Sequence, residues 1–258
     1  MRFRSIVITG ASRGLGAALA RRYAAPGVVL GLIGRDAAAL EAVALDCAAR
    51  GALPRLAVQD VRDAAGMDAL LREWDAAEPV DLAIANAGIA AGTRPDGAAE
   101  GLRALTAQVE VNLLGAAHLV EPLLPGMRAR GRGAIGLVTS LAALRGLPDS
   151  PGYCASKAGL WAWGEALRGR LRAEGVQVTL LAPGYFNSAM GDRYVGARPF
   201  SMSAEVAAAR VARALDREAA QAVFPWPLAL ALRLAPFLPA RVVDRVVGKM
   251  AFRVREQE

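Results

Sequence analysis

Lysine, histidine and cysteine are scarce in this sequence. Only Lys157 and Lys249 are lysine among its 31 basic residues, and His118 is the one histidine. We interpret His118, inside a predicted helix, as a packed or interfacial residue. Cys47 and Cys154 are isolated and have no metal-ligand spacing around them. Because that spacing is missing, we expect no metal site. Two isolated thiols also cannot form a disulfide framework, so we expect a reducing, cytoplasmic environment.

Long basic runs and a targeting segment are also missing. The formal net charge is +7, but the basic residues are spread along the chain, and their densest cluster, at 128–132, reads as a solvated helix end. This distribution argues against a nucleic-acid partner. The chain opens directly into a strand-like run at 5–9, without the apolar core and cleavage site of a signal peptide.

Short apolar runs alternate with helical patterns along the chain. Their nearly continuous Val, Ile, Leu and Ala predict strands buried on both faces. These runs lie at 5–9, 28–33, 56–58, 80–85, 134–139, 176–182 and 221–224. The alternation predicts an α/β fold with a doubly wound, mostly seven-stranded parallel sheet and helices on both faces. One long helix is expected around 103–127.

A glycine-rich turn, TGASRGLG at 9–16, follows the first predicted strand and opens a helix. Its glycines, Gly10, Gly14 and Gly16, have the spacing G-x-x-x-G-x-G. Glycines allow close approach of the backbone to a pyrophosphate, and a helix N-terminus offers free N–H groups and the positive end of its dipole. Many such turns are only chain reversals, but a position after the first strand of an α/β chain favours a dinucleotide site.

A tyrosine and a lysine stand four residues apart where a later helix begins, as Tyr153 and Lys157 in PGYCASK. Residues at this spacing lie on one helix face, so their side chains can share a site. The chain uses arginine at almost every basic position, which indicates that position 157 needs the compact ammonium of lysine.

The motifs occur in the order and at the spacing of one enzyme family. Over residues 4–217 the chain resembles the short-chain dehydrogenase/reductase family. The matching motifs are the turn at 9–16, Asp60-Val61, Asn86-Ala87-Gly88, Asn112, Ser140, Tyr153 with Lys157, and Pro183-Gly184.

This resemblance implies a Rossmann-type single domain at 1–224 and an oxidoreductase that uses a nicotinamide cofactor. It implies Asn112, Ser140, Tyr153 and Lys157 as catalytic residues. It also implies cofactor contacts from Gly10, Ser12, Arg13, Gly14, Leu15, Gly16, Arg35, Asp60, Val61, Asn86, Ala87, Gly88, Tyr153, Lys157, Pro183, Gly184 and Ser188.

The family resemblance gives each catalytic residue a role in reducing a carbonyl. Tyr153 is the general acid/base, Ser140 polarises the carbonyl, and Asn112 holds a water that relays protons. Lys157 binds the nicotinamide ribose, and its ammonium is expected to lower the pKa of Tyr153, since a nearby cation favours a phenolate.

The second predicted strand ends in LIGRD at 32–36, which bears on the choice of cofactor. Gly34 stands where an NAD enzyme usually has its ribose-binding acid, and Arg35 and Arg13 can bind a 2′-phosphate. We therefore favour NADP(H). NAD(H) remains possible, because a shift of one residue makes Asp36 the ribose ligand.

The residues from 225 to 258 form an apolar, then basic and amphipathic extension whose prolines and arginine argue against a spanning helix. Its last part places Val242, Val243, Val246, Val247 and Met250 opposite Arg241, Arg245, Lys249 and Arg253. Such a helix covers its own domain or a partner, the interpretation we favour, or lies on an anionic membrane.

The extension resembles the tails of mycobacterial keto-reductases acting on polyprenyl-phosphate-linked sugars, and the positions expected near the pocket are apolar. These are Leu141, Leu144, Leu147, Tyr185, Phe186, Met190 and Phe200. A lipophilic or lipid-linked carbonyl/alcohol is the predicted substrate. The alternatives are a non-catalytic dinucleotide sensor and an NAD-preferring alcohol dehydrogenase. The helices at 103–127 and 153–172 carry more apolar residues than one sheet face can cover, and the family resemblance implies that they form a subunit interface. We therefore expect a homodimer or homotetramer.

Overall fold

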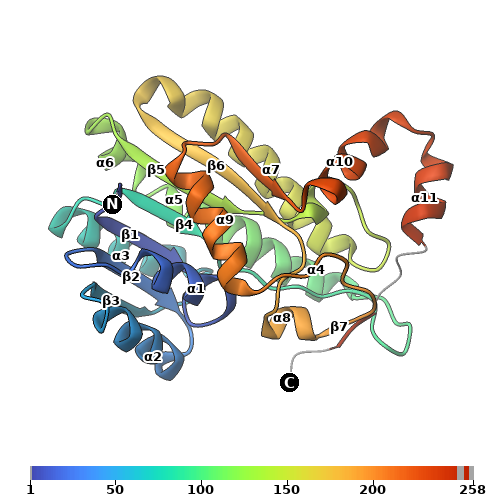
Figure 1. The fold of residues 1–258 in the computed structure, drawn as a ribbon, viewed down its shortest axis with the longest axis horizontal. Helices are drawn as coiled ribbons and strands as arrows, with labels where there is room; N and C mark the ends of the chain where they lie inside the picture. Colours follow the sequence, from blue (N-terminus) through green and yellow to red (C-terminus); the bar gives the residue numbers. More distant parts are fainter. Residues whose placement is uncertain (1, 249–252, 256–258) are drawn as a thin grey trace.

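The computed structural model describes residues 2–248 and 253–255. At its centre lies a seven-stranded parallel sheet with the order β3-β2-β1-β4-β5-β6-β8 (Figure 1). The order reverses between β1 and β4, which confirms the predicted doubly wound fold. The strands are β1 (Ser5–Thr9), β2 (Val29–Gly34), β3 (Leu53–Val58), β4 (Leu82–Ala85), β5 (Gly133–Val138), β6 (Val176–Pro183) and β8 (Gln221–Phe224).

Successive side chains of each strand point to opposite faces of the sheet, so both faces carry apolar residues. Helices cover both faces and complete two apolar cores. In β1, Ile6 and Ile8 belong to one core and Val7 to the other. The first core is covered by α1 (Gly14–Tyr23), α2 (Ala37–Ala48) and α9 (Ala204–Asp216). The second is covered by α3 (Ala64–Ala77), α5 (Gly115–Val120), α6 (Leu124–Ala129) and α7 (Pro151–Leu171).

The single long helix expected at 103–127 is wrong. The chain forms α4 (Gly101–Val109), a π-helical turn at Glu110–Leu114, then α5 and α6. The π turn closes when the Gly115 backbone N–H donates to the Glu110 carbonyl. Pro122 lies between α5 and α6, where it cannot continue the helical hydrogen bonds, and Pro125 lies in the first turn of α6, where proline is tolerated.

The third strand begins at Leu53, earlier than the apolar run at 56–58 predicts. It is an edge strand that pairs only with β2, so solvent-facing side chains interrupt its apolar pattern.

The C-terminal segment leaves β8 and forms α10 (Trp226–Leu234) and α11 (Ala240–Gly248), which stand at one end of the molecule (Figure 1). Its last described part, β9 (Arg253–Val254), returns to pair antiparallel with β7 (Tyr194–Val195). The predicted amphipathic positions Lys249 and Met250 lie outside the described residues. Within the described ranges, no helix is long and apolar enough to cross a membrane.

Candidate active site

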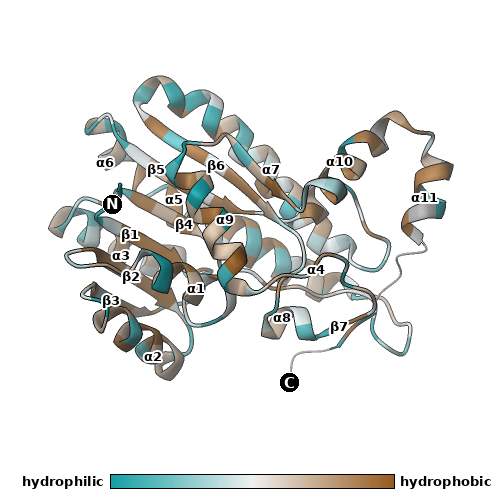
Figure 2. Cartoon of the chain, viewed as in Figure 1, coloured by the Kyte–Doolittle hydropathy of each residue, from teal (hydrophilic) through white to brown (hydrophobic). Residues whose placement is uncertain are grey.

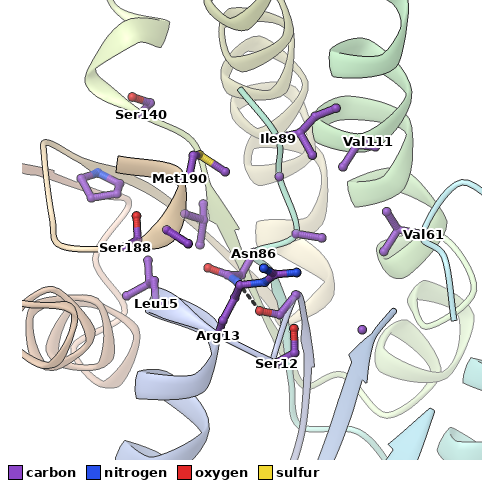
Figure 3. A pocket seen from close by; sticks show the side chains of 18 of the residues that line it. Ser12, Arg13, Leu15, Val61, Asn86, Ile89, Val111, Ser140, Ser188 and Met190 are labelled. Carbon is purple, nitrogen blue, oxygen red and sulfur yellow. Dashed lines mark hydrogen bonds between the residues drawn. The ribbon is translucent and has the colours of Figure 1, made fainter. Parts of the chain in front are cut away.

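A cavity of about 430 Å³ opens at the carboxyl ends of the strands, where the sheet order reverses between β1 and β4. At this place in a doubly wound sheet the loops after neighbouring strands diverge and leave a crevice for ligands. Figure 3 shows Ile89 and Val111 on the side of the cavity opposite Ser188.

The structure brings almost all of the predicted site residues to this cavity, from segments far apart in the sequence. Two predicted residues, Gly16 and Asn112, are not in its lining. The predicted residues that line it are Gly10, Ser12, Arg13, Gly14, Leu15, Arg35, Asp60, Val61, Asn86, Ala87, Gly88, Ser140, Tyr153, Lys157, Pro183, Gly184 and Ser188.

The turn after β1 is too tightly folded to accept side chains at two of its glycines. A Cβ at Gly16 would lie 2.1 Å from the Gly10 carbonyl oxygen, and one at Gly10, with φ +65°, would lie 2.9 Å from the Ala87 Cα. Gly16 therefore acts by close packing behind the cavity. The first turn of α1 follows Arg13, whose side chain makes no capping hydrogen bond. This backbone fits a pyrophosphate, because glycines and a helix N-terminus present N–H groups at short range.

Asn86 fastens the end of β4 to the glycine turn. Its Nδ2 donates to the carbonyls of Thr9 (3.0 Å) and Gly10 (3.2 Å), and its backbone N–H donates to Thr9 Oγ1 at 3.1 Å. A second donor, the Ala87 N–H, shares the same hydroxyl. These bonds fix the two loops that face each other across the crevice.

Near the end of β2, the two arginines and Asp36 lie in different surroundings. Gly34, Arg35 and Arg13 line the cavity, whereas Asp36 does not. Asp36 instead caps α2, because its Oδ1 accepts a hydrogen bond from the Ala39 N–H at 3.1 Å.

Asp60 has an arginine partner that the sequence did not predict. Arg62 Nε donates to both carboxylate oxygens of Asp60, at 3.2 Å for Oδ1 and 3.1 Å for Oδ2, and Arg62 Nη2 donates to Oδ2 at 2.7 Å. This hydrogen bonding holds the pKa of the Asp60 carboxyl below its ordinary value. Arg35 Nη1 lies 3.9 Å from the same carboxylate. The DVRD run at 60–63 was the available signal, since it puts the two charges within one turn.

Tyr153 and Ser140 come together at the inner end of the cavity. Burial raises the pKa of the Tyr153 phenol from 10.0 to about 12, and a hydrogen bond with the Ser140 side chain partly opposes this rise. Ser140 follows β5 and accepts a hydrogen bond from the Ala142 N–H at 3.2 Å. The hydroxyls of both residues are thereby placed at one wall of the cavity.

Lys157 lies on the same face of α7 as Tyr153 but is almost fully buried. Its Nζ donates to the Val138 carbonyl at 2.8 Å and lies 5.9 Å from the centroid of the Tyr153 ring. Burial lowers the pKa of this ammonium from 10.5 to about 8. The expectation that Lys157 brings the pKa of Tyr153 below its ordinary value is wrong for the protein alone. Burial of the phenol outweighs the attraction, and the ammonium is bonded to the Val138 carbonyl.

Asn112 lies behind the cavity, in the π-helical turn. Its Oδ1 accepts from the Ile89 N–H at 2.8 Å, and its Nδ2 donates to the Ile89 carbonyl and to Ser156 Oγ, both at 2.9 Å. Ser156 in turn donates to the Tyr153 carbonyl. Sequence reasoning missed Ser156, because a small hydroxyl inside Y-x-x-x-K carries no signal of its own. The network ties the π turn to α7 and to the loop that follows β4.

Of the seven apolar residues expected near a substrate, Leu141, Leu144, Leu147, Tyr185 and Phe200 are not in the cavity lining. Phe186 and Met190 line the cavity. Leu147 packs against α11 instead, and Phe200 is exposed. Arg193, which the sequence did not single out, also lines the cavity and donates to the Arg255 carbonyl at 2.8 Å.

His118 is not part of this cavity. Its Nδ1 lies 2.8 Å from the Val61 carbonyl oxygen, so the ring is fixed beside the loop that carries Asp60. This contact agrees with the predicted packing role.

Several known proteins have sequences related to that of this chain. The short chain dehydrogenase family matches residues 4–198. An uncharacterized oxidoreductase of Myxococcus xanthus is 34% identical over 97% of this chain and 98% of its own length. A 3-dehydrosphinganine reductase of Arabidopsis thaliana is 34% identical over 71% of this chain and 55% of its own.

Two solved structures have the same fold at lower identity. A short-chain dehydrogenase from Sphingobium yanoikuyae in complex with NADPH has a TM-score of 0.77 and 22% identity, covering 90% of this chain and 94% of that one. A short-chain dehydrogenase from Mycobacterium paratuberculosis bound to NAD has a TM-score of 0.76 and 23% identity, covering 85% and 95%. The family match, the sheet order and the residues gathered at its switch point lead to one conclusion: the chain is an oxidoreductase of the short-chain dehydrogenase family.

Proposed function

We propose that the protein is an NADP(H)-dependent reductase that transfers hydride between the nicotinamide and a lipophilic carbonyl/alcohol pair. The observation that carries this proposal is the gathering of Ser140, Tyr153 and Lys157 in one cavity with the glycine turn. A hydride acceptor bound beside Ser140 would have both hydroxyls within reach of its carbonyl oxygen.

The bound cofactor would supply or accept the hydride, and the chain would handle the proton. Tyr153 Oη–H donates its proton to the carbonyl oxygen as hydride reaches the carbonyl carbon, while the Ser140 hydroxyl holds that oxygen in place. The Lys157 ammonium, 5.9 Å from the Tyr153 ring, stabilises the phenolate left behind.

Asn112 acts in this proposal as a positioning residue. Both hydrogens of its side-chain amide are used in bonds to Ile89 and Ser156, so the amide keeps α7 and Tyr153 in register with the cavity wall. The expectation that Asn112 also holds a water that relays protons stays a prediction.

The two arginines at the adenosine end support NADP(H) over NAD(H). Arg13 and Arg35 reach the cavity, and a guanidinium can bind a 2′-phosphate through two parallel hydrogen bonds. Asp36, the acid that follows this strand end in the sequence, caps α2 and does not line the cavity. One structural neighbour was solved with NADPH and another with NAD, so the choice in this chain depends on its own residues.

The apolar part of the cavity lining supports a lipophilic substrate. It includes Ile89, Phe186 and Met190. The related Arabidopsis protein is named as a reductase of 3-dehydrosphinganine, a long-chain ketone. The transfer of a chain of methylene groups from water to such a surface lowers the free energy and so favours binding.

A panel of carbonyl compounds tests the proposal, with short, cyclic, long-chain acyl and polyprenyl-linked ketones. Loss of reduced nicotinamide absorbance is followed with NADPH and with NADH. We expect the highest kcat/KM for a long-chain ketone with NADPH. If none of the compounds leads to oxidation of NADPH, the proposal that the protein is a reductase is contradicted.

We also propose a homodimer formed through α4 and α7. The outward face of α7 carries the small exposed residues Ala155, Ala158 and Ala162. Leu102 of α4 and Leu114 of the π-helical turn are also exposed. Small residues allow two helices to approach closely. Light scattering at micromolar concentration should give a dimer or a dimer of dimers, and Ala158→Arg should shift it toward the monomer.

A further inference from the structure

The C-terminal helices present large apolar side chains to solvent. Trp226, Leu230 and Leu234 lie at intervals of four residues on one face of α10, and Phe237 and Leu238 continue this face before α11, which adds Val242. Trp226 is 73% and Phe237 is 85% exposed. We call these six residues the apolar ridge.

The ridge belongs to helices that are packed on their other side. Ala229, Ala235, Val243 and Val247 are buried, and three of them form a small core with Leu147. Arg145 Nη2 also pairs with Asp244 at 2.7 Å, from the loop after Ser140 to α11. The inward face therefore fixes the helices on the body, and the ridge is held outward.

Positive charge accompanies the ridge. Arg233, Arg241 and Arg245 lie in the same segment and are exposed. Among the residues that the structure describes, Arg241 and Arg245 have no hydrogen-bond or ion-pair partner. Asp244 is the one acid between residues 225 and 248, and it is paired with Arg145. The segment thus offers unneutralised guanidinium groups beside apolar side chains.

The ridge lies close to the proposed substrate side of the cavity. The Gly184 N–H donates to the Phe224 carbonyl at 2.7 Å, immediately before α10 begins, and Gly184 lines the cavity. At the other end, α11 rests on Leu147 in the loop that follows Ser140. Figure 1 shows α10 and α11 beyond the end of the three-layer body, and Figure 2 shows apolar residues along both.

We propose that α10 and α11 dock the protein on an anionic phospholipid bilayer, with the apolar ridge entering the interface and the arginines contacting lipid phosphates. Short helices that combine Trp, Phe and Leu with arginine lie in the plane of such an interface. A second copy of the chain fits this surface less well, because it would bring the same unpaired arginines together. Delivery of a membrane-dissolved ketone to the cavity would follow, and this last step alone rests on the proposed function.

Sedimentation with vesicles tests the docking directly. The full chain is mixed with vesicles of phosphatidylcholine alone and with vesicles that also contain phosphatidylglycerol. We expect the wild type to sediment with the anionic vesicles at least ten-fold more strongly than with the neutral ones. Phe237→Asp together with Leu238→Asp should reduce this binding at least ten-fold, because it places charges at the centre of the ridge. Arg241→Glu with Arg245→Glu should remove the preference for anionic lipid.

Leu45→Asp is the matched control, since Leu45 is an exposed leucine on α2. It should bind vesicles like the wild type. Tryptophan fluorescence gives a second readout: the emission should shift to the blue on binding, and Trp226→Phe should lose the shift while it still sediments. Circular dichroism and NADPH titration show that each variant is folded.

The proposal is overturned if the wild type does not sediment with anionic vesicles, or if the ridge variant binds as well as the Leu45→Asp control. It is also overturned if vesicle binding is absent and the ridge variant instead dissociates an oligomer, which would make a second copy the occupant. Because vesicle binding is measured without turnover, failure of the reductase proposal leaves this test intact.

Discussion

The sheet domain and the C-terminal helices use apolar residues in opposite ways. In β1 and β4, Ile6, Ile8, Leu82 and Ile84 are buried completely or nearly so between two layers of helices. In α10, successive turns place tryptophan and leucine in solvent. Apolar content alone therefore does not separate core from surface in this chain.

The two regions differ in how many faces of each strand or helix are covered by neighbouring elements. A parallel strand has neighbours on both faces, so almost any apolar side chain is covered. A helix at the end of the molecule has one neighbouring face, and its other face meets whatever surrounds the protein. In the two proposals above, the first region sets the chemistry of the protein and the second sets its location.

The largest expected effect is on the chemistry of the sheet domain. Tyr153→Phe removes the transferable proton and should lower kcat by about 10²- to 10⁴-fold. NADPH affinity, measured by fluorescence titration, should stay within about two-fold, because the ring remains. Tyr23→Phe, at the far end of α1, is the control and should keep wild-type turnover. Turnover by Tyr153→Phe near the wild-type rate would remove this residue from the mechanism.

The buried Lys157 should make stability depend on pH. Its pKa is about 8 in the folded chain and 10.5 as the ordinary value, so between these values the unfolded chain binds the extra proton. The free energy of unfolding should therefore rise with pH across this window, by about 3 kcal/mol for this group.

The measurement is urea unfolding of the wild type and of Lys157→Met, each at pH 7.5 and pH 10. All other groups titrate in both proteins, so the difference between the proteins isolates the effect of Lys157. The wild type should gain more stability than the variant between the two pH values. An equal change in both proteins would show that Lys157 is not buried as an ammonium.

Arg35 and Asp36, which are neighbours at the end of β2, are expected to differ in their effect on cofactor binding. Arg35→Ala should weaken NADPH binding by about 10- to 100-fold, equivalent to the loss of one charge-assisted contact of about 1.5–3 kcal/mol. NADH binding should hardly change. Asp36→Ala should leave both affinities unchanged and cost about 1 kcal/mol of stability as a lost helix cap. Tighter binding of NADH than NADPH to the wild type, abolished by Asp36→Ala, would reverse the assignment.

The smallest expected effect concerns the strand that returns from the C-terminal segment. Val254 is buried, and its N–H donates to the Thr93 carbonyl at 2.9 Å while β9 pairs with β7. Val254→Ala should loosen the segment at 185–203 and raise KM for the carbonyl a few-fold, with NADPH affinity unchanged. Limited proteolysis should cut this segment faster than in the wild type. Unchanged KM and cleavage would make β9 a passive ending.

The sequence was informative wherever a residue type is required by local chemistry. The glycines of the turn, Asn86 and Tyr153 could be placed because their motifs depend on nearby backbone. The pKa of Tyr153 could not, because the burial that raises it depends on segments far away in the chain. Asp36 also stayed ambiguous, since a helix cap and a ribose ligand occur at the same kind of strand end.

The contacts of the C-terminal segment were beyond prediction for a different reason. The amphipathic pattern of α11 indicates an apolar face but does not identify its neighbour. The structure supplies that neighbour in Leu147, and it also pairs Arg253–Val254 with a strand about sixty residues earlier. Such long-range pairings of two residues leave no periodicity in the sequence.

The central claim is that hydride passes from NADPH to a carbonyl carbon in the cavity at Ser140 and Tyr153. Its most direct test uses NADPH deuterated at the transferable position of the nicotinamide, with the long-chain ketone from the panel, and mass spectrometry of the alcohol formed. The account predicts one deuterium on the carbinol carbon with the wild type and none above background with Tyr153→Phe. An alcohol without deuterium, or equal labelling by both proteins, would contradict it.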